Sequence, residues 1–370
     1  MPARRVAAMQ RAAEARAEGL PIDQLRRALT DLFAPRPAVY WLDFLASAGC
    51  FYGGFAIAAG LPPDNKLTYA AAAVSVLGLY RAIIFIHELA HLPLGRMRGF
   101  RIVWHVVCGI PLLAPGFLYG SHVDHHRRPA YGTLEDGEYL PWGTAGQRLS
   151  ILAFLLSSFA ALPVAVLRFG VLTPLSWLSS RLRTWVAVNA SSLVVHPRYR
   201  RAPPPPAEAK VWRIEEAAVF GYLVLVAAGL SLDLIPVAWL MQLYLTLSAA
   251  MVLNSLRTLA AHRYRSAGRP LSATDQLLDS VNYPRPSWLT PLWAPVGLRF
   301  HAVHHLFAGI PYHNLGTAHA RIVQLVPPDS PYHRTEGHSL LASLRELWGA
   351  ARAAPRPELG GKNLRRSDAG

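Results

Sequence analysis

The sequence predicts an all-α, multi-pass membrane protein, and three observations support this fold class. Of the 370 residues, 52% are hydrophobic and only 16% are charged, which is more apolar than is usual for a soluble domain of this size. The hydrophobic residues gather in long runs, each near the length that crosses the hydrocarbon core of a bilayer. Arginines are concentrated before the first run and directly after the second, as in the cytoplasmic loops of membrane proteins.

Four of the apolar runs are expected to form transmembrane helices. The first, residues 38–61, contains one charge, Asp43, and the second, residues 67–86, contains only Arg81. Residues 219–232 and 235–253 form a closely spaced pair. Two more stretches, 102–119 and 149–167, contain prolines such as Pro111 and Pro163. Because proline interrupts helices, these two stretches are expected to be re-entrant or interfacial helices.

The distribution of charge predicts the orientation in the membrane. Seven arginines precede the first run, whereas the turns at 61–66 and 231–236 carry one lysine between them. Positively charged loops stay in the cytoplasm, so four crossings would leave both termini and the polar loops there. The net charge of +15 is then explained by anionic lipid headgroups, and no nucleic-acid partner is expected. The chain divides into a cytoplasmic amphipathic segment (1–37), a membrane domain (38–330) and a cytoplasmic tail (331–370).

Eight of the fifteen histidines fall into three short groups. His87 and His91 belong to a motif that matches the zinc-protease pattern H-E-x-x-H. The other two groups share the pattern H-x-x-H-H, which a shuffled chain of this histidine content would contain about 0.02 times. Residues three or four apart share one face of a helix, so each group can point imidazoles at one centre. Eight imidazoles suit two metal ions, although imidazole alone does not select among zinc, copper, iron and nickel. The groups are His87 and His91; His122, His125 and His126; and His301, His304 and His305.

These motifs resemble the three histidine boxes of the membrane fatty acid desaturase/hydroxylase superfamily. HELAH matches the first box, SHVDHH the second and FHAVHHLFAGIPYHNL the third. Ala308 stands where many members have proline. The resemblance covers residues from about 40 to 330. It implies an O₂-activating diiron enzyme with a histidine-lined catalytic cap on the cytoplasmic side, in which the eight box histidines bind two iron ions. His262, in NSLRTLAAHRY, resembles the additional ligand that members place between the second and third boxes.

Polar residues beside the boxes are candidates for supporting the metal ligands. Carboxylates that accept a hydrogen bond from the outer ring nitrogen of a ligating histidine are expected near such a site. Asp124, Glu135, Asp136 and Glu138 surround the second box closely enough for this role, although a solvated acidic turn is the alternative. Other candidates for an outer role around the metal are Glu88, Asn254 and His313.

The first functional expectation is a fatty acid (acyl-lipid) desaturase, an oxidoreductase of the bacterial inner membrane. The alternative is a lipid or carotenoid hydroxylase or ketolase of the same superfamily. The sequence has neither a glycine-rich dinucleotide motif nor a cysteine cluster, so a separate ferredoxin- or cytochrome-type donor is expected to supply electrons. Two other classes are distant alternatives. An intramembrane zinc protease would need a Leu-Asp-Gly motif, and Asp233 is followed by Leu234. A metal transporter would place its site near the bilayer midplane, whereas these histidines are expected to cluster at the cytoplasmic face.

Overall fold

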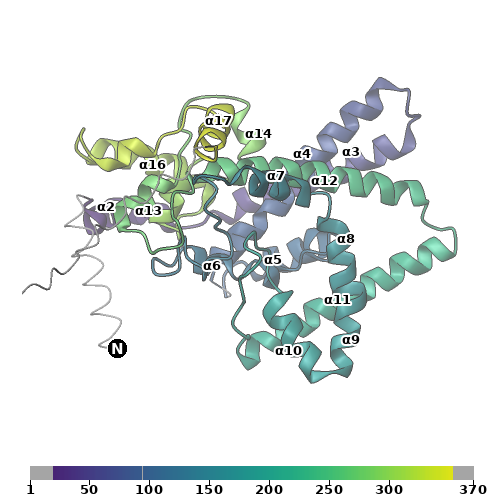
Figure 1. Ribbon diagram of the computed structural model, residues 1–370. Coiled ribbons are helices and arrows are strands. Elements are labelled where there is room, and N and C mark those ends of the chain that lie inside the picture. Colours follow the sequence, from purple (N-terminus) through teal and green to yellow (C-terminus); the bar gives the residue numbers. More distant parts are fainter. Residues whose placement is uncertain (1–19, 94, 353–370) are drawn as a thin grey trace, which may run out of the picture.

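The computed structural model describes residues 20–93 and 95–352 and consists of helices joined by loops (Figure 1). Within these residues, β-structure is limited to three isolated bridges, so the predicted all-α fold is confirmed. In the described part of the chain, five helices are long and apolar enough to cross a membrane, one more than the four expected. The protein is therefore an integral membrane protein. The five helices span Pro37–Gly60, Lys66–His91, Ala161–Leu178, Pro206–Ser231 and Val237–Ala261.

Helices α3 (Pro37–Gly60) and α4 (Lys66–His91) form a tightly packed hairpin. Their bounds match the first two predicted spans closely, and α4 continues to His91. A side chain at Gly78 would place its Cβ only 2.5 Å from the backbone nitrogen of Phe51. A close approach of two helix backbones in a membrane requires such small residues. The hairpin therefore fixes the end of α4, where His87 and His91 lie.

Asp43 of α3 and Arg81 of α4 form an ion pair inside this hairpin. The guanidinium of Arg81 donates two hydrogen bonds to the carboxylate of Asp43, each 2.6 Å long. The hydroxyl of Tyr312 donates to the same carboxylate at 2.8 Å. A charge within the membrane is stabilised by pairing, so these residues join α3, α4 and the chain that follows the third histidine group.

The stretch 102–119 forms a short helix and turns, and no spanning helix covers it. Helix α5 (Arg98–Trp104) continues into a π-helical turn, η2 (His105–Gly109), and a 3₁₀ turn, η3 (Gly116–Tyr119), follows. The indole nitrogen of Trp104 donates to the carbonyl of Ala82 at 3.0 Å, which packs α5 against α4. The turn η3 and the helix α6 (His122–His125) that follows it also contact α4.

The fifth apolar helix overlaps the stretch predicted to be interfacial, but with different bounds. Helix α7 (Arg148–Ser157) ends before Pro163, and a continuous helix then runs through α8 (Ala161–Val166), the π-helical η4 (Leu167–Leu172) and α9 (Thr173–Leu178). Pro163 lies in the first turn of α8, where a missing backbone N–H breaks no helical hydrogen bond. Arg168 does not end the helix, because its buried guanidinium donates to Glu216 at 2.5 Å.

Helices α11 (Pro206–Ser231) and α12 (Val237–Ala261) form the second long hairpin. Both extend beyond the predicted runs 219–232 and 235–253. The first extension contains Glu216, which is fully buried and pairs with Arg168 and with Arg183 of α10 (Ser180–Asn189). Buried charges are tolerated when paired, which explains why the helix continues through an acidic sequence.

Short helices cover the end of the molecule that carries the histidines. Leu25 and Leu29 of the N-terminal segment pack with Phe307 in one apolar cluster, and Leu347 packs with Leu259 of α12 in another. Residues 331–350, assigned to the cytoplasmic tail, are thus folded, and the domain division stays a prediction. Residues 1–19 and 353–370, which belong to the predicted terminal segments, lie outside the described residues. The short elements are α2 (Ile22–Ala28), η1 (Thr30–Phe33), α13 (Ala273–Asp279), α14 (Thr290–Trp293), α15 (His301–Leu306), η5 (Tyr312–Asn314), α16 (Leu315–Leu325), η6 (Pro331–Thr335) and α17 (Leu340–Ala350).

Candidate metal centre

Nine histidine side chains from distant parts of the chain lie together at one end of the long helices. The last turn of α4 supplies two of them, α6 and the residue after it supply three, and α15 supplies three. The ninth, His262, directly follows α12. They form two groups in which one ring nitrogen of each residue lies within 4.8 Å of those of the others. The five-histidine group is His87, His91, His122, His126 and His304, and the four-histidine group is His125, His262, His301 and His305.

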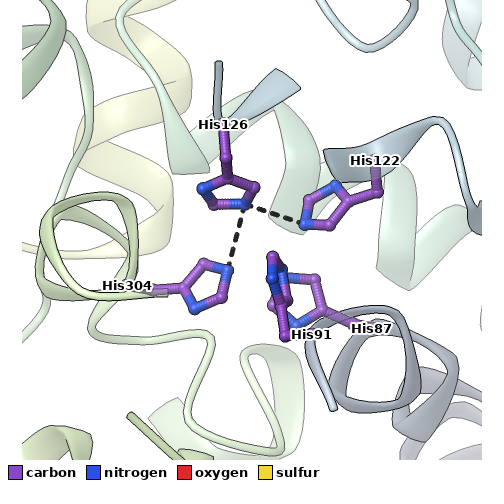
Figure 2. Close-up of side chains that lie close together, drawn as sticks. All are labelled: His87, His91, His122, His126 and His304. Atoms are coloured by element: carbon purple, nitrogen blue, oxygen red, sulfur yellow. Dashed lines mark hydrogen bonds between the residues drawn. The ribbon is translucent and has the colours of Figure 1, made fainter. Parts of the chain in front are cut away.

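The rings of the five-histidine group point toward one another (Figure 2). The Nε2 atom of His126 lies 3.0 Å from Nε2 of His122 and 3.1 Å from Nε2 of His304. His87 and His91, at the end of α4, are the remaining two members of this group. Both ring nitrogens of His87 and Nε2 of His91 are buried without a hydrogen-bond partner among the described residues. A buried polar atom without a partner is costly, so these atoms favour a bound cation.

The four-histidine group has the same arrangement around His262. Its Nε2 atom lies 2.9 Å from Nε2 of His301 and 3.2 Å from Nε2 of His125. The Nε2 atoms of His305 and His301 are 3.1 Å apart. His262 is therefore one of the four histidines of this group, as its resemblance to the additional ligand of superfamily members predicts.

The geometry of both groups fits metal ions. When two ligand nitrogens meet at a right angle around a metal at about 2.1 Å, they are about 3.0 Å apart, close to the observed spacings of 2.9 to 3.2 Å. Burial and the neighbouring imidazoles lower the pKa of His126 and His305 well below the usual value. Neutral imidazoles carry the lone pair that binds a metal. Five imidazoles exceed the four ligands of a typical structural zinc site.

Carboxylates hold the outer nitrogens of two of these rings. Nδ1 of His122 lies 2.9 Å from Oε1 of Glu138, and Nδ1 of His125 lies 2.9 Å from Oδ2 of Asp136. A ring that donates through Nδ1 keeps the lone pair of Nε2 for a metal. Asp136 is fully buried and accepts backbone hydrogen bonds from Gly132 and Glu138. Of the two accounts of these carboxylates, the structure favours the supporting role over a solvated turn.

The other predicted supporting residues lie elsewhere. Glu88 accepts hydrogen bonds from the Tyr40 hydroxyl at 2.5 Å and the Tyr312 backbone at 3.3 Å rather than from an imidazole. Asp124 pairs with Arg127 at 3.0 Å on the partly exposed side of α6. Nε2 of His313 accepts from the backbone of Arg36. Among the described residues, none of the three forms a hydrogen bond with the nine histidines, and Asn254 instead lines the cavity described below.

Sequence reasoning missed the support of His262. Nδ1 of His262 lies 2.8 Å from the hydroxyl of Tyr131, which donates to Asp279 at 2.8 Å. Tyr139 also donates to Asp279, at 3.1 Å. All four side chains are buried. The available signal is Asp279, an acidic residue beside apolar residues in LLDSV. It belongs to no histidine motif.

An internal cavity of about 280 Å³ reaches the histidines from between the long helices. Its walls include Ile83 of α4, Leu162 of α8 and Leu247 of α12, which are apolar. Its inner end is lined by histidines of both groups, including His87 and His262. A mostly apolar cavity with a few polar groups at one end is typical of a site for a small or chain-like ligand.

The shared site also restricts how the chain crosses the membrane. His91 ends α4 and His262 follows α12, so an even number of crossings separates these two residues. Helices α11 and α12 supply two crossings, and a third by residues 161–178 would place His262 on the opposite side. Figure 1 shows α8 and α9 running across the direction of α11 and α12. Four crossings therefore require residues 161–178 to lie along the membrane, and the number of crossings stays a prediction.

Comparison with known proteins identifies relatives of the chain. A family model described as "Fatty acid desaturase" matches residues 64–336. A protein of Caulobacter vibrioides named "Ceramide hydroxylase" is 39% identical over 331 residues, which cover 87% of this chain and 91% of the relative. No solved structure matches. The hydroxylase relative overturns the expectation of an acyl-lipid desaturase and favours the alternative of a lipid hydroxylase. The family match and the relative together show that the chain belongs to the fatty acid desaturase family, within the superfamily of membrane desaturases and hydroxylases.

Proposed function

We propose that this protein hydroxylates a lipid of the ceramide class at an unactivated carbon. The observation that carries this proposal is the 39% identity to a ceramide hydroxylase over 91% of that relative's length. The cavity supports it, because its apolar walls between the long helices can hold the alkyl chain of a lipid that is bound beside the histidines. The proposed enzyme is thus an oxidoreductase that acts on a membrane lipid.

The nine histidines are proposed to hold two iron ions, one in each group. Bound iron would supply the redox chemistry that couples reduction of O₂ to oxidation of a C–H bond. Zinc has no redox chemistry, so a zinc enzyme could not carry out this reaction. The box histidines are the proposed ligands, together with His262, while Asp136, Glu138 and Tyr131 orient the rings through their Nδ1 atoms.

The chain's own residues prepare the substrate for this reaction. The apolar walls bind the alkyl chain and exclude bulk water, and the packed α3–α4 hairpin keeps the end of α4 in place. One oxygen atom of O₂ enters the C–H bond and the other becomes water, which consumes two electrons and two protons. A separate ferredoxin- or cytochrome-type protein is proposed to supply the electrons from the cytoplasmic face, in a bacterial inner membrane. Three arginines directly after α4, Arg96, Arg98 and Arg101, favour an acidic donor on this face.

The proposal is tested by turnover of the purified, iron-loaded protein in lipid vesicles that contain a defined ceramide. We expect an O₂-dependent product that has gained one oxygen atom, and only when a reductase and a carrier protein are supplied. A product that has lost two hydrogens, or unchanged ceramide alongside turnover of another lipid, would contradict the proposed reaction. Elemental analysis of the same sample measures iron and zinc per chain, and stoichiometric zinc without iron would contradict the metal assignment.

A further inference from the structure

The cavity that leads to the histidines has a polar end, and this end lies next to the proposed metal centre. Along α12 the cavity lining changes from Leu247 and Met251 to Asn254 and Arg257, and His262 follows the helix. At 1.5 Å of rise per residue, Arg257 lies about 8 Å along the axis from His262, whereas Leu247 lies about 22 Å away. An alkyl chain alone would need no polar groups beside the histidines.

Arg257 is a buried cation with spare donors. Only 8% of the residue is exposed, and its Nε atom is buried without a hydrogen-bond partner among the described residues. One terminal nitrogen donates to Oδ1 of Asn254 at 3.2 Å, and the guanidinium also interacts with the hydroxyl of Tyr80. A guanidinium has five N–H donors and no acceptor. Within the described part of the chain, no carboxylate forms an ion pair with Arg257, although other buried arginines such as Arg168 have one.

Hydroxyl groups lie on the same part of the cavity wall. The side chains of Ser158 and Ser255 are both buried and hydrogen-bond each other at 3.0 Å, and both line the cavity. Hydroxyls can donate and accept, so they complement the donors of Arg257. Together, Arg257, Asn254, Ser158 and Ser255 form what we call the polar end of the cavity.

We propose that the polar end of the cavity binds the amide head of the lipid substrate, with Arg257 donating to the amide carbonyl oxygen. This inference rests on the proposed function and deepens it. The amide N–H has acceptors in the serine hydroxyls, and Ser158 or Ser255 can also bond a hydroxyl of the sphingoid base. The alkyl chain then extends toward Leu162 and Leu247, away from the histidines. Arg257 is therefore a residue that determines substrate specificity and position.

The arrangement also predicts where the substrate is oxidised. A head bound at Arg257 sits beside the histidines, so the carbon that reaches them lies within a few bonds of the amide. An enzyme that oxidises the middle or the far end of a chain would instead need an apolar lining next to the metals. The hydroxyl group is therefore expected on a carbon near the polar head.

The test compares the binding of two lipids by the iron-loaded protein in detergent, without turnover. One lipid is a short-chain ceramide, and the other is an analogue in which a methylene group and a methyl branch replace the amide N–H and carbonyl. The variants are Arg257→Met, which keeps the length of the side chain but removes its donors, and Arg257→Lys, which keeps the charge but not the planar fork. Asn254→Leu provides a second variant on the same wall if Arg257→Met does not fold. Iron content and thermal unfolding are recorded for each protein.

We expect the wild-type protein to bind the ceramide more tightly than the analogue. Arg257→Met should weaken ceramide binding about 10- to 100-fold, the usual effect of losing a hydrogen bond to a charged group, and should leave binding of the analogue unchanged. Arg257→Lys should lie between the two. Equal wild-type affinity for both lipids, or equal weakening of both by Arg257→Met, would overturn the inference. Stronger binding of a free fatty acid than of ceramide would also overturn it, because a carboxylate would then be the preferred partner.

Mapping of the product separates this inference from the proposed function. A desaturated product would refute hydroxylation, while the binding comparison would still decide the role of Arg257. A hydroxyl group placed far along the chain by the wild-type protein would refute head binding next to the histidines and leave hydroxylation intact. A residue with a purely structural role would change stability or iron content without changing the ratio of the two affinities.

Discussion

Replacement of Asp136 by asparagine should weaken metal binding by the four-histidine group. Both carboxylate oxygens of Asp136 are fully used. Oδ1 accepts from the backbone of Glu138 at 2.9 Å, Oδ2 accepts from the backbone of Gly132 at 2.9 Å, and both lie 2.9 to 3.0 Å from Nδ1 of His125. The amide of asparagine has only one oxygen, so its NH₂ group must face one of the two backbone N–H donors.

The magnitude follows from these contacts. One buried backbone donor loses its acceptor, which costs about 1 to 3 kcal/mol of folding stability. The ring of His125 also loses a charged partner, and loss of an outer partner typically lowers metal affinity about 10- to 100-fold. Because His122 of the five-histidine group is held by Glu138 instead, we expect the variant to retain one iron and to lose most of the second at limiting iron.

The assay is an iron titration of the metal-free protein, read by iron bound per chain and by thermal unfolding. Asp124→Asn is the matched control, because Asp124 lies beside the same histidines in the sequence but pairs with the exposed side chain of Arg127. The control should bind iron as the wild type does. Normal iron affinity in Asp136→Asn, or a comparable loss in Asp124→Asn, would refute the assignment of Asp136 as a support of the site.

Three further outcomes are expected. His91→Ala should abolish turnover and lower iron per chain, because no neighbouring side chain can replace its imidazole; full iron content would contradict its place in the five-histidine group. Glu88→Gln should keep iron and activity and lose at most about 1 kcal/mol of stability, since an amide oxygen can still accept from Tyr40; complete inactivation would instead point to a general base of the zinc-protease type. Asp43→Ala should destabilise the protein by about 2 kcal/mol in detergent unfolding, because it leaves the charge of Arg81 without its partner; unfolding at the wild-type midpoint would show that the pair is not stabilising.

The sequence predicted the histidine pattern well because that information is local. His87 and His91 share a helix face through their spacing alone, and the same holds within each H-x-x-H-H group. Proximity to the second box drew attention to four carboxylates, and the structure places two of them, Asp136 and Glu138, on Nδ1 of histidines.

Contacts between distant parts of the chain could not be predicted in this way. The support of His262 by Tyr131 and Asp279 joins residues far apart in the sequence, and no periodic pattern encodes it. The bond between Glu88 and Tyr40 likewise depends on how α3 packs against α4. The helix at 161–178 was not predicted because Pro163 and Arg168 argue against it. Pro163 is tolerated because it lies in the first turn of α8, and Arg168 is tolerated because it pairs with Glu216 of α11.

The histidine motifs also do not distinguish a desaturase from a hydroxylase. Both reactions begin at a C–H bond beside the same kind of metal site, and they differ in how the substrate is held. The histidine motifs do not contain that information, and the finding that favours a hydroxylase is the 39% identity to a ceramide hydroxylase. The expectation of a desaturase was wrong for this reason.

The wide separation of the histidines along the chain has a consequence for biogenesis. His87 belongs to an early hairpin, whereas His304 of the same group is made only after all the long helices have been synthesised. Neither group is complete until α15 emerges from the ribosome, so a metal could bind the full set of histidines only at the final stage of folding. Once bound, a metal closes a loop that contains most of the membrane domain, which disfavours partial unfolding of either end. A chain that stops before the third box would therefore lack His301, His304 and His305, and neither group of histidines would be complete.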